Sequence, residues 1–336
     1  MSYFLAIDAG GTKTQCLLAD ETRVLARAST GTVKLMRVNE AEATARLQTM
    51  LSEVSAAAGV SLAHVTRTCF GLAGFCSPAV RAWAERAVAA EVSGELQLCG
   101  DEEIALDAAF GAEQGILVVA GTGSTAIGRT SKGEIVGAGG WGPVLGDQGS
   151  GMWIGLEAIR AALAARDREP LRSLKSDSSG SLNQSRSDFS GHSSSLLGEI
   201  AHHWQLNSLG ELIAHANHRG DAHHFVPDFA SLAPVVARCA EQGDAVATEV
   251  LRRAGVELAA LVALVAKKIS ASQIEVAFTG SVLAQIAAVR SAMIAQLAIL
   301  FPAAQIRPSA VDALDGALWR ARRFGSPASI SALHVR

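Results

Sequence analysis

The sequence predicts an α/β protein built from two related lobes that face each other across a cleft. An apolar strand at 3–7 leads into a turn of glycine and threonine and then into a second strand, and the same series returns at 115–129. A repeat of this kind indicates two units of similar architecture. The chain length of 336 residues is also sufficient for two domains of ordinary size.

Apolar periodicity predicts the other elements. In the first half, strands are expected at 15–19, 24–29, 67–72 and 96–99, and helices at 39–58, 79–90 and from 102 to about 110. Asn39 is a suitable N-cap, with Glu42 as its capping-box partner. In the second half, strands are expected at 115–120, 125–129 and 275–278, a helical pattern at 196–270 with one long helix at 244–268, and a last helix at 312–323. The serine-rich stretch 173–195 is expected to be a flexible surface insertion.

The composition of the chain limits which binding partners and which cellular location are expected. The net charge of −3 includes no basic excess that would indicate binding to nucleic acid or to an anionic membrane. No apolar run approaches the roughly 20 residues of a membrane span, and no charged leader precedes the first strand, so a cytoplasmic protein is expected. None of the five cysteines forms a CxxC pair, which favours free thiols in a reducing compartment.

The first glycine turn lies in Asp8-Ala9-Gly10-Gly11-Thr12-Lys13-Thr14. Glycines let a backbone approach an anion closely, and successive N–H groups form an anion-binding nest to which Thr12 and Thr14 can add hydroxyl donors. Asp8 can hold Mg²⁺ through water. A plain β-hairpin turn is the alternative. The spacing excludes a Walker loop, and a turn that leads into a strand excludes a dinucleotide fingerprint.

The second glycine turn, Gly121-Thr122-Gly123-Ser124, repeats this chemistry, so the two turns are expected to clamp the phosphates of a nucleotide from both lobes. A glycine-rich loop follows at 139–151, where six of thirteen positions are glycine. A purely structural loop rarely needs so many, because each glycine costs backbone entropy on folding. Trp141 and Asp147 are the residues of this loop whose side chains could contact a ligand. The alternatives are core packing for Trp141 and an N-cap role for Asp147.

A carboxylate at the end of the strand 96–99, Asp101, can accept the proton of a hydroxyl group as it attacks phosphorus. The alternative is that Asp101 caps the helix that begins at Glu102. Three further acids on that helix, Glu102, Glu103 and Asp107, are expected to be solvated or to stabilise the helix dipole.

Together these motifs resemble the N-acetylglucosamine kinase branch of the BadF/BadG/BcrA/BcrD-type ATPase family. The most specific part is Gly140-Trp141-Gly142 followed by the run 146–155, and the similarity continues through 240–244, 279–282 and 313–317. The resemblance covers nearly the whole chain except 173–195.

The resemblance implies two ribonuclease-H-like lobes of the actin-like ATPase fold with an interlobe cleft: residues 1–113 with 312–336 in one lobe, and 114–311 in the other. It implies that the protein uses ATP and Mg²⁺ and transfers the γ-phosphoryl group to the 6-hydroxyl of an amino sugar. N-Acetylglucosamine is the first candidate for this sugar. Glucosamine or N-acetylmuramate are alternative substrates. An activator ATPase of radical dehydratases and a non-catalytic sugar or nucleotide sensor are alternatives of another class. A homodimer is one expectation for the assembly.

Residue by residue, the resemblance implies Asp101 as the catalytic base. The ATP-binding positions are Gly10, Gly11, Thr12, Lys13, Thr14, Gly121, Thr122, Gly123, Ala230, Gly280 and Ser281. The substrate-binding positions are Lys34, Ser124, Thr125, Gly140, Trp141, Gly142 and Asp147.

Two positions depart from the pattern of the family. Lys34 stands where an asparagine is usual, and Gln148 where an acid is common. An ammonium group only donates hydrogen bonds, whereas an amide donates and accepts. Lys34 could therefore pair with the carboxylate of N-acetylmuramate or with Asp101, or it could be a surface residue.

Overall fold

The computed structural model describes residues 1–168, 196–218, 228–270 and 274–323, so the predicted insertion at 173–195 lies outside the described residues. The described part contains two sheets, ordered β3-β2-β1-β4-β5 and β10-β9-β6-β7-β8. The first sheet comprises β1 (Tyr3–Ala9), β2 (Lys13–Ala19), β3 (Val24–Gly31), β4 (Val65–Leu72) and β5 (Glu95–Gly100). The second comprises β6 (Gly115–Ala120), β7 (Ser124–Arg129), β8 (Ile135–Gly139), β9 (Glu275–Thr279) and β10 (Gln305–Ile306). Both sheets begin with an antiparallel hairpin and continue with parallel strands, which confirms the predicted repeat and the α/β class.

Helices cover the faces of the two sheets. Around the first sheet lie α1 (Glu40–Ala58), α2 (Pro78–Ala89), α3 (Asp101–Phe110) and α11 (Ala313–Arg323), with a 3₁₀ turn at Leu62–His64. The second half contains α4 (Gly151–Arg168), α5 (Leu196–His203), α6 (Leu209–Ala216), the 3₁₀ turn Phe229–Leu232, α7 (Ala233–Glu241), α8 (Ala245–Ile269), α9 (Ser281–Gln285) and α10 (Ala287–Leu300). Asn39 caps α1 as predicted, since its side chain accepts the N–H of Glu42 at 2.9 Å.

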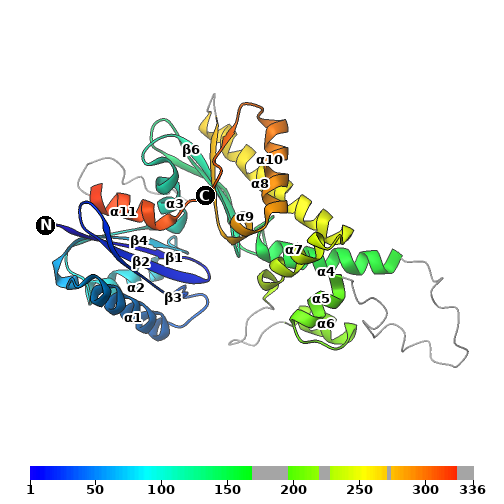
Figure 1. The fold of residues 1–336 in the computed structure, drawn as a ribbon, viewed down its shortest axis with the longest axis horizontal. Helices are drawn as coiled ribbons and strands as arrows, with labels where there is room; N and C mark the ends of the chain where they lie inside the picture. Colours follow the sequence, from blue (N-terminus) through cyan, green and yellow to red (C-terminus); the bar gives the residue numbers. More distant parts are fainter. Residues whose placement is uncertain (169–195, 219–227, 271–273, 324–336) are drawn as a thin grey trace, which may run out of the picture.

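The first sheet is buried on both faces, as parallel and mixed sheets of α/β proteins usually are. Along β1, Leu5 and Ile7 pack on the side of α1 and α2, whereas Phe4 and Ala6 pack on the side of α11. This alternation follows from the two-residue period of a strand. Figure 1 shows α11, from the end of the chain, beside the first sheet. The grouping of 312–336 with residues 1–113 stays a prediction, and residues 324–336 lie outside the described part of the chain.

The helix α3 lies between the two sheets. Ile104 packs with α11 and the first sheet, while Leu106 and Phe110 pack with the second sheet, including Leu117 of β6. A helix buried on all sides needs apolar residues around its whole circumference, and most of α3 has them. Because α3 begins at Asp101, the element that joins the two sheets also carries the predicted base.

The remaining charges of α3 correct one prediction. Glu103 and Asp107 were expected to be solvated or to stabilise the helix dipole; both are buried, so the solvated alternative is wrong. The Asp107 carboxylate pairs with Arg129 of β7, with 2.6 Å between Nη2 and Oδ1, and with Arg320 of α11. Arg320 also pairs with Glu103 at 3.2 Å. The expectation failed because the partners of Asp107 come from 22 and 213 residues away, so nothing local in the sequence indicates them.

The five cysteines all lie in described residues and are free, as predicted. Cys76 is exposed, and Cys16, Cys69, Cys99 and Cys239 are buried. Among the helices that the structure describes, none has the length and apolar character that crossing a membrane requires.

Candidate active site

The first glycine turn is tied to the loop that follows β3. The Gly10 N–H donates to the Lys13 carbonyl at 3.1 Å, which closes the turn. The Thr32 hydroxyl donates to the Gly10 carbonyl at 3.0 Å. Thr14 is fully buried, its hydroxyl accepts the N–H of Val33 at 3.2 Å, and it does not line the cavity described below. Thr14 instead holds the loop against the turn.

The second glycine turn is packed between two other segments. The Gly121 N–H donates to the Gly123 carbonyl at 3.0 Å, and the first amide of α4, from Gly151, donates to the Gly121 carbonyl at 2.8 Å. Gly280 has a φ of +94°, and a Cβ there would lie 2.3 Å from the Ala120 carbonyl oxygen. Only glycine allows the turn after β9 to lie this close to the end of β6.

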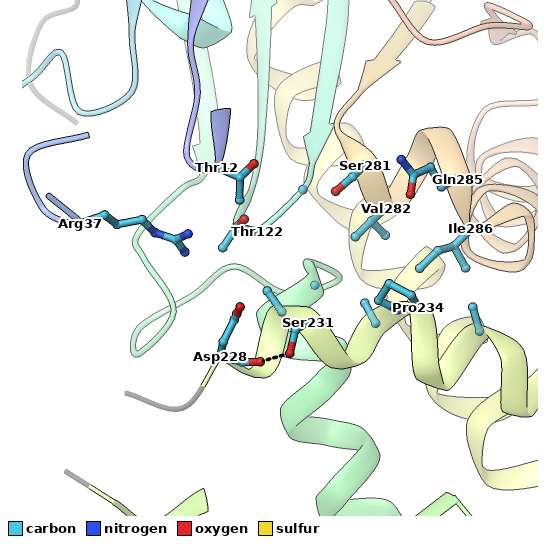
Figure 2. A pocket seen from close by; sticks show the side chains of 15 residues that line it. Thr12, Arg37, Thr122, Asp228, Ser231, Pro234, Ser281, Val282, Gln285 and Ile286 are labelled. Atoms are coloured by element: carbon cyan, nitrogen blue, oxygen red, sulfur yellow. Dashed lines mark hydrogen bonds between the residues drawn. The ribbon is translucent and has the colours of Figure 1, made fainter. Parts of the chain in front are cut away.

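Both glycine turns open into one cavity of about 280 Å³, shown in Figure 2. Its first-half lining residues are Thr12 and Arg37. The second half contributes Gly121, Thr122, Gly151, Asp228, Ala230, Ser231, Ala233, Pro234, Ala237, Ser281, Val282, Gln285 and Ile286. Small and apolar side chains dominate the part formed by α7 and α9, which suits the flat base of a nucleoside.

The cavity includes some of the predicted ATP-binding residues and adds others. Thr12, Gly121, Thr122, Ala230 and Ser281 line it, whereas Gly10, Gly11, Lys13, Gly123 and Gly280 are neighbours of lining residues. The sequence analysis missed Arg37, Asp228 and the walls from α7 and α9. The alanines at 230, 233 and 237 are a usable signal, because small residues at helical spacing leave room beside a helix.

Asp101 is the first residue of α3, and Gly100 occupies the N-cap position, so the capping alternative is not observed. Burial raises the pKa of Asp101 well above its usual value, and the negative charge and hydrogen bond of Glu102 and the charge of Asp8 raise it further. The positive charge of Lys34 opposes this rise. A raised pKa suits a general base, which works best when its pKa lies near the operating pH.

Asp8 lies at the end of β1 near the same charges. Burial raises its pKa to about 6, the Asp312 carboxylate raises it as well, and Lys13 lowers it. None of the described residues donates a hydrogen bond to the Asp8 carboxylate. A partly buried carboxylate without a donor fits a cation site, because a cation would stabilise its charged form. Among the described residues, no group of three or more His, Cys, Asp or Glu side chains could hold a metal ion.

The positive charge of Lys34 acts on one carboxylate from each half of the chain. Its charge lowers the pKa of Asp101 and also that of Asp147, which burial otherwise raises. Lys34 is half-buried, and its role as a sugar ligand stays a prediction.

The glycine-rich loop holds Asp147 in an unusual conformation. Asp147 is buried with a φ of 60°, in the left-handed region, and its carboxylate accepts the N–H groups of Ser124 and Gly142. Residues in this region cluster at functional sites. The alternative N-cap role is wrong, because the Ser150 hydroxyl caps α4 by accepting the Trp153 N–H at 3.2 Å.

The other residues predicted to bind the sugar differ in how exposed they are and in which hydrogen bonds they already make. Trp141 is 57% exposed, so the core-packing alternative is wrong. Gly140 and Gly142 flank it with positive φ values of 70° and 86°. The Ser124 hydroxyl donates to the Gln148 carbonyl at 2.7 Å and the Thr125 hydroxyl to the Ala138 carbonyl at 3.2 Å. Both hydroxyls therefore keep only acceptor capacity for a ligand.

Two sheets of equivalent order with a cavity between two glycine turns define the class of two-lobed ATPases of the actin and hexokinase fold. Solved structures share the architecture. A Chromobacterium violaceum protein with the provisional name N-acetylglucosamine kinase superimposes with a TM-score of 0.69 at 24% identity, covering 95% of this chain and 98% of that one. A ROK family glucokinase from Streptomyces griseus, in complex with glucose and AMPPNP, gives 0.54 at 16% identity over 96% and 100% of the two chains.

The chain belongs to the BadF/BadG/BcrA/BcrD ATPase family, whose model matches residues 5–319. It is similar to the N-acetylmuramic acid/N-acetylglucosamine kinase of Clostridium acetobutylicum, with 29% identity over 281 residues, 83% of this chain and 84% of that one. It is also similar to the N-acetyl-D-glucosamine kinase of Dictyostelium discoideum, with 28% identity over 178 residues, 49% of this chain and 55% of that one.

Proposed function

We propose that this protein is an ATP-dependent kinase that transfers the γ-phosphoryl group of ATP to a hydroxyl, O6, of an amino sugar, with N-acetylglucosamine as the first candidate. The observation that carries the proposal is the convergence of Thr12 and Thr122, from two different halves of the chain, on one cavity. The names of the Clostridium and Dictyostelium relatives support the choice of sugar.

Phosphoryl transfer requires a general base, a sugar hydroxyl aligned with the γ-phosphorus, and stabilisation of the charge on the phosphate chain. The sugar oxygen attacks the γ-phosphorus and forms the new O–P bond while the bond to the bridging oxygen breaks. The proton of the hydroxyl passes to the Asp101 carboxylate, and the electron pair of the broken bond leaves with ADP. Thr12 and Thr122 hold the phosphates in line, which is most of what phosphoryl transfer requires of a protein. Asp8 would hold Mg²⁺, which would supply positive charge to the phosphates.

The sugar site contains a cation in addition to hydrogen-bonding groups. The charge of Lys34 lowers the pKa of both Asp101 and Asp147, and an ammonium group can donate to sugar hydroxyls or pair with a carboxylate. The lactyl carboxylate of N-acetylmuramate would meet such a partner, and glucosamine, which is itself cationic, would be repelled. N-Acetylmuramate is therefore the alternative substrate that the charges favour.

The deciding experiment is an assay of ADP formation by the purified protein with ATP and Mg²⁺ over a panel of sugars. The panel comprises N-acetylglucosamine, N-acetylmuramate, glucosamine and glucose. Turnover with an N-acetylated amino sugar well above that with glucose is expected. A protein that forms ADP with none of the amino sugars would not be the kinase proposed.

Exchange of Lys34 for asparagine is expected to shift the preference toward N-acetylglucosamine. A charge-assisted hydrogen bond contributes about 1.5–3 kcal/mol, so the kcat/KM for N-acetylmuramate should fall by about 10- to 100-fold relative to that for the neutral sugar. Lys132→Asn, on the exposed turn between β7 and β8, is the matched control and should change neither value. An unchanged substrate profile for Lys34→Asn would place this residue outside the sugar site.

The pH dependence of kcat should report the charges around Asp101. The base works only when ionised, so the rate falls as the pH drops through its pKa, which the structure places above the usual value. Glu102→Gln removes a charge that raises this pKa, so its acid limb should move to lower pH. Lys34→Asn removes a charge that lowers it, so its acid limb should move to higher pH. Shifts of the two variants in the same direction would contradict the assignment of Asp101.

A further inference from the structure

Arg37 is a cation at the ATP cavity that no family motif in the sequence indicates. Of the residues that line the cavity it is the only cationic one, and Asp228 is the only acid. It is half-buried, yet in the part of the chain that the structure describes its guanidinium group has no ion pair or hydrogen bond. A guanidinium group without a partner beside a cavity is available to an anionic ligand.

Local contacts fix the position of Arg37 relative to the first glycine turn. The backbone folds into a turn in which the N–H groups of Arg37 and Val38 donate to the Lys34 carbonyl at 2.7 and 3.2 Å. The loop is attached to the glycine turn through the hydrogen bonds of Thr32 and Thr14 described above. These hydrogen bonds fix the backbone of the Arg37 loop relative to the turn that carries Thr12.

The direction of the side chain is visible in Figure 2. The Arg37 side chain extends from the first half of the chain with its guanidinium group directed toward Thr122 of the second glycine turn. Thr12 lies on the same side of the cavity as Thr122, and the apolar wall from α7 and α9 lies beyond it. The guanidinium group is thus at the phosphate end of the cavity, away from the surface suited to the base.

We infer that Arg37 binds the phosphate chain of ATP, and that it does so from the half of the chain opposite the nucleoside wall. This inference rests on the proposed function. Arginine presents its donors in a planar fork that matches phosphate oxygens, and such charge-assisted bonds are about twice as strong as neutral ones. A phosphate chain is a strong anion, and the side chains lining its cavity supply no other positive charge. Arg37 stabilises the charge on the phosphates and draws the two glycine turns onto them.

The test uses the full chain with Arg37→Gln, Arg37→Lys and the control Arg252→Gln, whose side chain is exposed on α8. Steady-state kinetics are measured with ATP and sugar varied separately, and calorimetry measures the binding of AMPPNP with Mg²⁺ in the absence of sugar. We expect Arg37→Gln to lower kcat/KM for ATP by about 10- to 100-fold and to weaken AMPPNP binding, with little change in the KM for sugar. Arg37→Lys should recover part of the loss, because lysine keeps the charge but not the fork. Arg252→Gln should match the wild type.

Two results would overturn the inference. One is an Arg37→Gln variant whose AMPPNP affinity and kcat/KM for ATP equal those of the wild type. The other is an Asp228→Asn variant that reproduces the full loss of Arg37→Gln, since that would make Arg37 the partner of Asp228 across the cavity and not of the phosphates. Neither result would contradict the proposed function, because that function is tested separately by the turnover of the wild type with the sugar panel.

Discussion

Replacement of Asp101 by asparagine is expected to lower kcat by about 10²- to 10⁴-fold, the usual contribution of a general base. Asparagine has nearly the same shape as aspartate but cannot accept the proton of the attacking hydroxyl. Asp101 is absent from the lining of the ATP cavity, so the affinity for AMPPNP should remain close to that of the wild type. Single-turnover kinetics and calorimetry on the same preparation measure the two quantities.

The matched control is Asp167→Asn, an exposed position at the end of α4 far along the helix from the cavity. It should behave as the wild type in both measurements. A variant Asp101→Asn that keeps more than about a tenth of the activity would lose less than a missing general base should cost, and Asp101 would then not be the base.

The second large effect is expected on stability. Asp107→Ala should lower the free energy of unfolding by about 3–5 kcal/mol, because it leaves the buried Arg129 and the largely buried Arg320 without their shared carboxylate. Arg129 belongs to the second sheet and Arg320 packs with the first, so the loss affects the contact between the two halves. Urea unfolding followed by tryptophan fluorescence measures the change, since Trp319 lies on α11 beside this contact.

Glu249→Ala is the control for this prediction. Glu249 pairs with Arg252 at 2.7 Å, but both side chains are more than half exposed, and surface pairs contribute about 0–1 kcal/mol. If Asp107→Ala and Glu249→Ala shift the unfolding midpoint equally, the buried charges of α3 do not stabilise the fold.

The sheets were predictable because their signals are local. The strand that begins at Tyr3 and the strand that begins at Gly115 each read as apolar runs that end at glycine, and the recurrence of that series is visible in the sequence alone. β8 was not recognised, because its glycines obscure the strand pattern. The burial of Asp107 was also not predictable, because it depends on partners distant in the chain.

The candidate site also contains some residues that local sequence motifs predict and others that only the fold reveals. The two glycine turns, Asp101 and the glycine-rich loop carry local motifs, and the structure brings the turns together at one cavity. Arg37 and Asp312 carry no motif. Arg37 reaches the cavity because hydrogen bonds attach its loop to the first turn, and Asp312 acts on Asp8 because the chain returns to the cleft after β10. Such residues are found only when the fold is known.

The most direct test of the account is a crystal structure of the protein with AMPPNP, Mg²⁺ and N-acetylglucosamine. We predict that the triphosphate touches both glycine turns, through Thr12 and Thr122, and that an Asp101 carboxylate oxygen lies about 2.6–3.2 Å from the sugar hydroxyl that faces the γ-phosphate. A nucleotide held by only one of the turns, or an Asp101 side chain directed away from the sugar, would contradict the account.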